Sequence, residues 1–385
     1  MRLFHINGDL QMKKSLIALA ALATVATAAQ AQSSVTIYGV IDAGIARTNS
    51  DTSGKSVTGM ANGGLATSRL GFRGTEDLGS GLKANFVLEA EFLADDGSQT
   101  STAEALFARQ STVGLEGGFG RVDLGRINSG SYALQAKFDP MGANNIGGII
   151  ATAQIGQVRV ENSVTYTSPS FNGLQVALQT GTRTSSTTGT YGEIAGETNG
   201  NRNNTASLSY TSGNLELAAY VADSKDAAGT KLHDNTGAFA RYNFGVARVT
   251  AGYINVDYKN KAAAASTTAA SNTSSAFSTS GDTIETTKTF VGVNVPVSAN
   301  LTLNGLVEQI QYKRYTASDR EPMIYTLGAT YNLSKRTALY AIYSQVNQDN
   351  GSAQTNVSTT KFAEFSGAKA DKDKTAYAVG IRHSF

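Results

Sequence analysis

The side chains that could take part in catalysis or metal binding are few in this 385-residue chain. It contains no Cys and only three His, and two of these, His233 and His383, lie in the second half of the sequence. A metal site needs clustered Cys or His ligands, and a Ser-His-Asp triad needs a His oriented in a pocket. The Gly-rich run at 117–120 is not followed by Gly-Lys-Ser/Thr, so it does not indicate a phosphate-binding loop. We therefore expect no enzyme activity, no metal and no cofactor.

Arginines offer a different chemistry, a positive charge that persists at any working pH. Arg69 and Arg73 lie an even number of residues apart, and Leu70 and Phe72 occupy alternate positions between them. In an extended strand this spacing places the guanidiniums on one face and the apolar side chains on the other. Arg69 is therefore predicted to face water. Two interpretations of Arg73 stay open: a charge on the same face, or a local partner for the acids at 76 and 77.

The start of the chain resembles no part of a folded domain. Met12-Lys13-Lys14 precedes a short apolar run at 15–23, and small residues follow as far as Ala29-Gln30-Ala31. A basic segment, a short apolar segment and an A-x-A site are typical of a secretory signal peptide. A helical membrane anchor is the alternative, but the run is too short to span a bilayer. We predict a signal peptide at 1–31, with Met12 as the initiator.

Removal of residues 1–31 also changes the charge of the protein. It takes away three basic residues and one acid, which lowers Lys+Arg from 32 to 29 and Asp+Glu from 30 to 29. The mature chain is then neutral overall. No global basic field remains that could attract nucleic acid, so any effect of charge must be local.

From residue 32 onward the dominant pattern is an alternation of apolar and polar residues. Leu174, Val176 and Leu178 alternate with polar or small residues, and the stretches at 291–295 and 323–331 do the same. Such alternation predicts strands with one apolar face. The other face is mostly Ser, Thr, Asn, Gln, Gly and Ala, and the apolar face often ends in Tyr or Phe. This pattern favours a membrane barrel with lipid outside and water inside.

Short and long connections alternate along the chain. Seven short turns and eight long polar stretches predict 16 strands in a single domain at 32–385, with both ends on the short-turn side. An open sheet edge in lipid would leave unpaired backbone groups, so the sheet must close, and 16 strands enclose a water-filled lumen. The predicted strands are 34–48, 65–76, 81–94, 107–116, 121–127, 161–168, 173–182, 203–212, 214–224, 234–244, 246–258, 284–296, 300–313, 322–332, 336–349 and 374–385.

Several segments, in order and over the whole mature chain, resemble the general Gram-negative porins, most closely those of betaproteobacteria. The segments are Gln32-Ser33-Ser34-Val35-Thr36-Ile37-Tyr38-Gly39, Ser68-Arg69-Leu70-Gly71-Phe72-Arg73-Gly74, Phe107-Ala108-Arg109-Gln110, Phe119-Gly120-Arg121-Val122-Asp123-Leu124-Gly125-Arg126, Tyr166-Thr167-Ser168-Pro169 and the terminal Gly380-Ile381-Arg382-His383-Ser384-Phe385.

The resemblance implies an all-β, 16-stranded antiparallel transmembrane barrel with short periplasmic turns and long external loops. It also implies a homotrimer in the outer membrane, in contact with lipid and lipopolysaccharide, that passes small hydrophilic solutes. In such porins the third long loop, here 128–160, folds into the pore and narrows it. The terminal Phe385 resembles the assembly signal of outer-membrane barrels, and it is also predicted to be an outward-facing interfacial aromatic.

The same resemblance suggests which residues line the constriction. By position, Arg69, Arg109 and Arg159 correspond to a wall cluster of arginines that faces acids on the third loop. Strict alternation would instead group Arg109 with an apolar face. From 128 to 158 the loop carries one acid, Asp139, and Asn144 and Asn145 stand where related porins can carry carboxylates. Three guanidiniums facing one carboxylate predict a weakly anion-selective passive channel.

Two further charged residues have open interpretations. Asp42 is expected to be either an ordinary carboxylate of the lumen wall or a partner of the arginine cluster. Arg126 shares a face with Val122 and Leu124, so it is expected either at the trimer interface or at the rim.

Two alternatives to a passive channel also remain at this point. One is a substrate-specific channel with a binding site for a small anion or a sugar, and the other is a purely structural anchor or adhesin.

Overall fold

The computed structural model describes residues 34–48, 56–99, 105–142, 146–152, 157–183, 201–259, 283–314, 318–347 and 374–385. The predicted signal peptide, Asn144 and Asn145 lie outside these residues. Among the described residues, no helix is long and apolar enough to cross a membrane.

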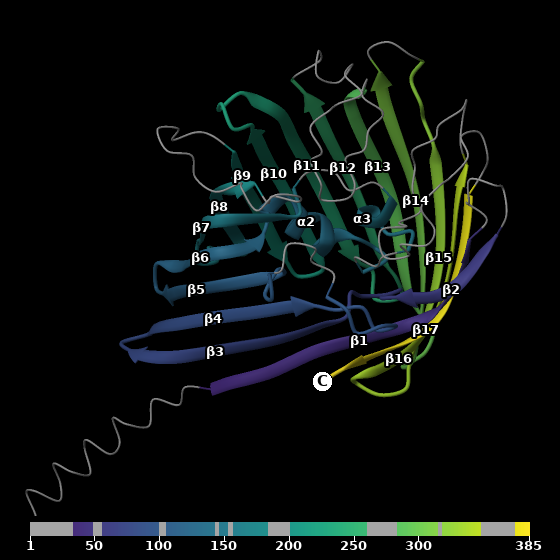
Figure 1. The fold of residues 1–385 in the computed structure, drawn as a ribbon, viewed down its shortest axis with the longest axis horizontal. Helices are drawn as coiled ribbons and strands as arrows, with labels where there is room; N and C mark the ends of the chain where they lie inside the picture. Colours follow the sequence, from purple (N-terminus) through teal and green to yellow (C-terminus); the bar gives the residue numbers. More distant parts are fainter. Residues whose placement is uncertain are drawn as a thin grey trace, which may run out of the picture.

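The described part of the chain forms one sheet of 17 antiparallel strands that closes into a barrel (Figure 1). The strands are β1 (Ser34–Thr48), β2 (Val57–Asn62), β3 (Arg69–Gly79), β4 (Leu82–Glu91), β5 (Gln110–Gly117), β6 (Gly120–Asn128), β7 (Arg159–Thr167), β8 (Leu174–Arg183), β9 (Arg202–Ser212), β10 (Leu215–Lys225), β11 (Lys231–Asn243), β12 (Arg248–Tyr258), β13 (Thr283–Pro296), β14 (Leu301–Arg314), β15 (Met323–Asn332), β16 (Thr337–Asn347) and β17 (Lys374–Ser384).

The 17 strands fill 16 positions in the barrel wall, because β2 and β3 share one position beside β1. Residues 34–40 of β1 pair with β3, and residues 43–48 pair with β2, while β17 pairs along the opposite edge of β1. Strand β2 therefore continues the line of β3 and occupies the same wall position. The predicted 16-stranded barrel is confirmed, and β2 is an additional strand within what was expected to be a loop at 49–64.

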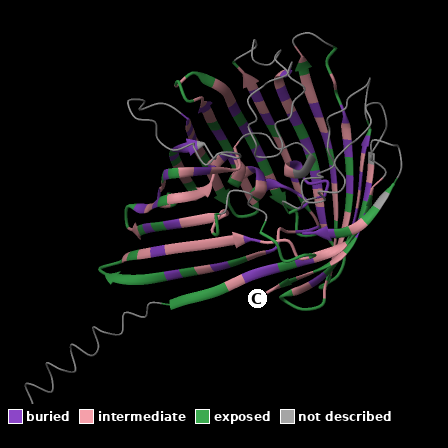
Figure 2. Ribbon diagram, in the orientation of Figure 1, coloured by how far each residue is buried: buried purple, intermediate pink, exposed green. Residues whose placement is uncertain are grey.

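Alternation along each strand separates the two faces of the wall (Figure 2). On β13, Lys288 and Phe290 face the interior and are 0% and 3% exposed, whereas Val291 faces outward and is 56% exposed. Exposed apolar side chains cover the outside of other strands too, including Ile45, Val113 and Leu327. This apolar outer face would be costly in water and suits contact with lipid.

Exposed aromatic side chains gather near the short-turn end of the outer face. They are Phe119, Phe171, Tyr242, Phe244, Tyr331 and Phe385. Aromatic rings prefer the interface between lipid and water, so this row marks one boundary of the membrane.

The connection between β6 and β7 folds into the barrel and carries two helices, α2 (Gly130–Phe138) and α3 (Ile149–Thr152) (Figure 1). The side chain of Ser129 caps α2 by accepting a hydrogen bond from the Tyr132 N–H at 3.2 Å. At the other end of α2, the Phe138 ring stacks on Phe239 of β11, with 5.2 Å between the ring centroids. The predicted inward-folded third loop is therefore confirmed.

The rest of this loop is attached to the wall formed by β13–β16. The Thr326 hydroxyl donates to the Gly147 carbonyl at 2.8 Å, and the Asn294 amide donates to the Pro140 carbonyl at 2.7 Å. The Lys288 ammonium donates to the Ile149 carbonyl and forms a fully buried ion pair with Glu308 at 2.9 Å.

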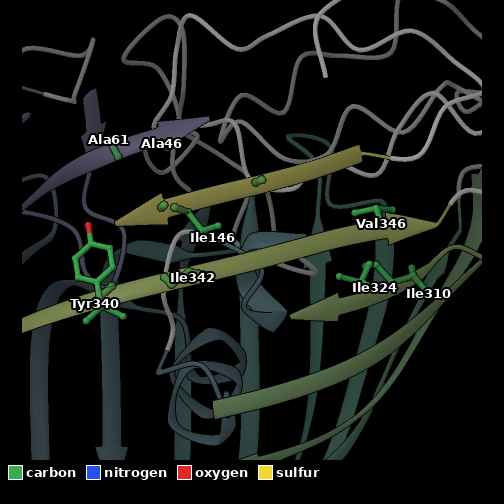
Figure 3. Close-up of a cluster of buried hydrophobic side chains, with 11 residues drawn as sticks. Ala46, Ala61, Ile146, Ile310, Ile324, Tyr340, Ile342 and Val346 are labelled. Carbon is green, nitrogen blue, oxygen red and sulfur yellow. The ribbon is translucent and has the colours of Figure 1, made fainter. Parts of the chain in front are cut away.

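An apolar cluster completes this attachment of the loop. Ile146 lies among buried side chains of the wall, whose labelled members in Figure 3 are Ala46, Ala61, Ile310, Ile324, Tyr340, Ile342 and Val346. The loop is thus held across the lumen both by hydrogen bonds and by apolar packing.

Candidate pore constriction

A group of charged side chains lines the lumen at about mid-height, where Arg69 pairs with Val40 near the middle of β1. Arg109 is its centre. Its Nε lies 2.6 Å from Glu89 Oε1, and its Nη1 lies 2.5 Å from Glu91 Oε2. Glu89 and Glu91 are two residues apart on β4 and therefore face the same side of the strand. One guanidinium thus bridges both carboxylates.

Arg69 and Arg159 flank this centre. Arg69 Nε lies 3.7 Å from Glu89 Oε2, and the same carboxylate accepts a hydrogen bond from the Tyr38 hydroxyl at 3.0 Å. Arg159 Nε donates to the Arg109 carbonyl at 3.0 Å. The structure therefore brings together the three arginines that the sequence analysis grouped.

The acid that was predicted to face these arginines was Asp139 on the third loop, and this prediction was wrong. Asp139 makes no ion pair with the arginine group in the described residues. It is 4% exposed, and its Oδ1 accepts the Met141 N–H at 2.8 Å. The acids that face the arginines are Glu89 and Glu91 on the neighbouring wall strand. The sequence analysis missed them because it counted acids on the loop alone.

Asp42 faces the interior of the barrel but does not partner the arginine cluster. Its carboxylate is fully buried and accepts the N–H groups of Gly64, Leu65 and Ala66 at 3.1, 2.9 and 2.8 Å. It also accepts the Tyr340 hydroxyl at 2.8 Å. These donors lie where the chain passes from β2 to β3, so Asp42 satisfies backbone groups that the break in this wall position leaves without strand partners.

The other two predicted arginines make contacts near the cluster. The Arg73 guanidinium lies over the Tyr38 ring, 5.1 Å from its centroid, and makes no ion pair with the acids at 76 and 77 in the described residues. Arg126 donates to the Ala108 carbonyl at 2.6 Å and forms an ion pair with Glu161. It therefore ties β7 to the segment that precedes β5.

Phe385 holds the end of the chain against β1. Its backbone exchanges two hydrogen bonds with Gly39, each 3.1 Å long. A Cβ at Gly39 would come within 2.3 Å of the Phe385 ring, so the ring takes the space that a side chain there would fill. The exposed ring lies in the row of aromatics near the short-turn end.

The arrangement suits the passage of ions. Among the residues that the structure describes, no three His, Cys, Asp or Glu side chains are grouped as metal ligands. The lumen instead presents fixed charges beside a loop that crosses it, which are the elements that set selectivity in a pore.

Comparison with known proteins supports this description over nearly the whole chain. A sequence profile described as Gram-negative porin matches residues 18–351. Outer membrane porin protein 32 of Delftia acidovorans is 34% identical, over 97% of this chain and 100% of that protein. An outer membrane porin protein of Bordetella pertussis is 32% identical, with the same coverage of both chains.

Solved structures agree with the fold. The structure described as an anion-selective porin from Comamonas acidovorans is 29% identical, with a TM-score of 0.72, and the match covers 92% of this chain and all of that one. OmpT of Vibrio cholerae, 15% identical with a TM-score of 0.63, shares the fold. The chain therefore belongs to the Gram-negative porin family and forms a passive channel through the outer membrane.

Proposed function

We propose that this porin prefers anions as it passes ions and small hydrophilic solutes. The observation that carries the proposal is the balance of charge at the candidate constriction. Arg69, Arg109 and Arg159 face two carboxylates, those of Glu89 and Glu91, which leaves one positive charge in excess. A surplus of one sign in a narrow part of a pore favours ions of the other sign. The relative from Comamonas acidovorans, described as anion-selective, supports this sign.

The proposal extends to the organisation and assembly of the chain. Residues 1–31 are a signal peptide, residues 32–385 form one barrel domain, and 128–160 is the constriction loop. Three barrels associate as a homotrimer, for which the trimer form of the Vibrio cholerae OmpT supplies a precedent of the same fold. The outer apolar face contacts lipid and lipopolysaccharide, and Phe385 acts as an assembly signal at the end of β17.

Reversal potentials of the purified porin in planar bilayers test the preference. With KCl at different concentrations in the two chambers, we expect a reversal potential of the sign set by chloride. Arg336→Gln is a matched control, because Arg336 is exposed in the turn before β16 and lies away from the candidate constriction. It should leave the potential unchanged. A potential of the sign set by potassium in the unmodified protein would refute the proposal.

A further inference from the structure

A second group of cations lies in the lumen beside the third loop. It surrounds a cavity of about 320 Å³. The loop lines this cavity with residues 136–137 and 139–142, the wall lines it with residues from each strand from β11 to β17, and Leu65 lines it from the segment between β2 and β3. The cations are Lys137 on α2, Arg241 on β11, Arg248 at the start of β12 and Arg382 near the end of β17. Arg241 and Arg248 lie on either side of the short turn between β11 and β12, whereas Arg382 pairs with Asp42 on β1, two residues from the point where Arg69 pairs with Val40. The cavity therefore reaches from the short-turn end of the barrel to the candidate constriction.

The acids around this cavity leave part of the positive charge uncompensated. Lys137 Nζ lies 3.1 Å from Glu216 and Arg241 Nη1 lies 3.5 Å from the same carboxylate, so one acid serves two cations. Asp139 is the acid that lines the cavity itself, and it is almost fully buried.

Arg248 and Arg382 differ from the other two cations because neither forms an ion pair with an acid in the described residues. The Nε atom of Arg382 is buried and has no hydrogen-bond acceptor there. A buried charged donor without an acceptor is costly, so an anion that supplied one would be stabilised. Arg248 is exposed on the same cavity and leaves a second guanidinium available.

Neutral donors lie on the wall of the same cavity. Asn294 Nδ2 donates to both the Pro140 carbonyl and Asn304 Oδ1, each at 2.7 Å. This fixes the Asn304 amide with its oxygen toward Asn294 and leaves its nitrogen as a donor. Thr330 adds a hydroxyl group to the lining. Such donors complement guanidiniums in the recognition of anions with several oxygens.

We propose that this cavity is an oxyanion-binding subsite, which takes inorganic phosphate or a small molecule that carries a phosphate or carboxylate group. Arg248 and Arg382 are its principal ligands, because planar guanidiniums match the oxygens of these anions in pairs. The subsite deepens the proposed anion preference and depends on the pore admitting anions. It adds a binding step beside the constriction, at which a bound oxyanion hinders the passage of chloride.

Block of chloride current by inorganic phosphate tests the subsite. In single-channel recordings in KCl, phosphate added to both chambers should lower the conductance of the unmodified porin in a saturable way. In Arg248→Gln/Arg382→Gln, the phosphate concentration that gives half of the block should rise roughly tenfold or more, as expected for loss of charge-assisted hydrogen bonds. Arg336→Gln changes an arginine of the same rim that lies outside the cavity. Its chloride current should be blocked by phosphate at the same concentrations as that of the unmodified porin.

Two further measurements separate the possible failures. Arg248→Lys/Arg382→Lys keeps both charges but loses the paired N–H donors of the guanidiniums. The phosphate concentration that half-blocks this variant should therefore lie between the values for the unmodified porin and for the double glutamine variant. The heat-dependent shift of the barrel on a gel shows whether each variant folds. Absence of saturable block in the unmodified porin, or equal block in the folded glutamine variant, overturns the subsite. A potassium-selective reversal potential with intact phosphate block would overturn the proposed function and leave the subsite standing.

Discussion

Arg109 Nε lies 2.6 Å from Glu89 Oε1, so the central arginine of the candidate constriction is neutralised by the wall rather than by the loop. This pairing sets the strength of the expected selectivity. If the carboxylates of Glu89 and Glu91 offset part of the positive charge, removal of their negative charges must increase the surplus of positive charge.

The variant Glu89→Gln/Glu91→Gln should therefore strengthen the anion preference. The chloride-to-potassium permeability ratio should rise roughly two- to fivefold, because two negative charges leave the narrow part of the pore. Reversal potentials in a KCl gradient measure the ratio. Glu116→Gln is the matched control, since Glu116 is half-buried near the short-turn end of β5, 3.8 Å from Arg121. A permeability ratio that falls in the double variant would contradict the account.

The anion preference should also depend on pH through Asp139. Burial raises the pKa of Asp139 to about 7, with a further increase from Glu308 and an opposing effect of Lys288. Arg241 is the other charged group that acts on it. Because a raised pKa keeps the carboxyl neutral at lower pH, its negative charge is lost as the pH falls through about 7. The preference for chloride should accordingly be greater at pH 6 than at pH 8.

Asp139→Asn separates this effect from that of other titratable groups. Asn retains an oxygen for the Met141 N–H but cannot ionise, so the change in reversal potential between pH 6 and pH 8 should shrink. If the reversal potential of this variant changes between pH 6 and pH 8 as much as that of the unmodified porin, the pH dependence arises from groups other than Asp139.

Gly147 should be needed for the close approach of the third loop to the wall. Its φ is +67°, and a Cβ there would lie 2.4 Å from Thr326 Oγ1 and 2.5 Å from Ser344 Oγ. Gly147→Ala should cost about 2 kcal/mol, from left-handed backbone strain and a weakened hydrogen bond to Thr326. We expect a larger and noisier single-channel conductance as the loop leaves the wall.

Gly142→Ala gives the matched comparison. Gly142 also has a positive φ, +76°, but a Cβ there would meet nothing within 4 Å. This variant carries the backbone strain without the clash, so its conductance should stay near that of the unmodified porin. Equal conductances in both variants would show that the contact with Thr326 and Ser344 does not hold the loop.

Asp42 should stabilise the barrel rather than affect its selectivity. Asp42→Ala leaves three backbone N–H groups and the Tyr340 hydroxyl without this acceptor, at about 1–3 kcal/mol for each buried donor left unpaired. The temperature at which the barrel shifts on a gel should therefore drop markedly, while Tyr340→Phe, which removes one donor, should lower it only slightly. A similar small drop in both variants would argue against the role assigned to Asp42.

The sequence predicted most of the wall because strand alternation is a local signal. The sequence also predicted that Arg69 faces the water-filled lumen, because successive side chains of a strand point to opposite faces. The neighbouring Leu70 is indeed exposed on the outer face. It did not predict β2, a six-residue strand that pairs with half of β1 only.

The charge pairs at the site could not be predicted in the same way. Arg109 lies just before β5, which begins at Gln110, so the alternation of that strand does not determine its side. Glu89 and Glu91 meet the arginines through the register of β3, β4 and β5, in which Arg69 pairs with Glu91 and Glu89 pairs with Gln110. Register between strands depends on the whole barrel and has no local signature in the sequence.

The central claim is that the arginine surplus at the candidate constriction sets the preference for anions. The most direct test is the reversal potential of Arg69→Gln/Arg109→Gln beside the unmodified porin in the same KCl gradient. The account predicts that the chloride-to-potassium permeability ratio falls below unity, because one arginine then faces two carboxylates and the surplus of charge becomes negative. A ratio equal to that of the unmodified porin would contradict it.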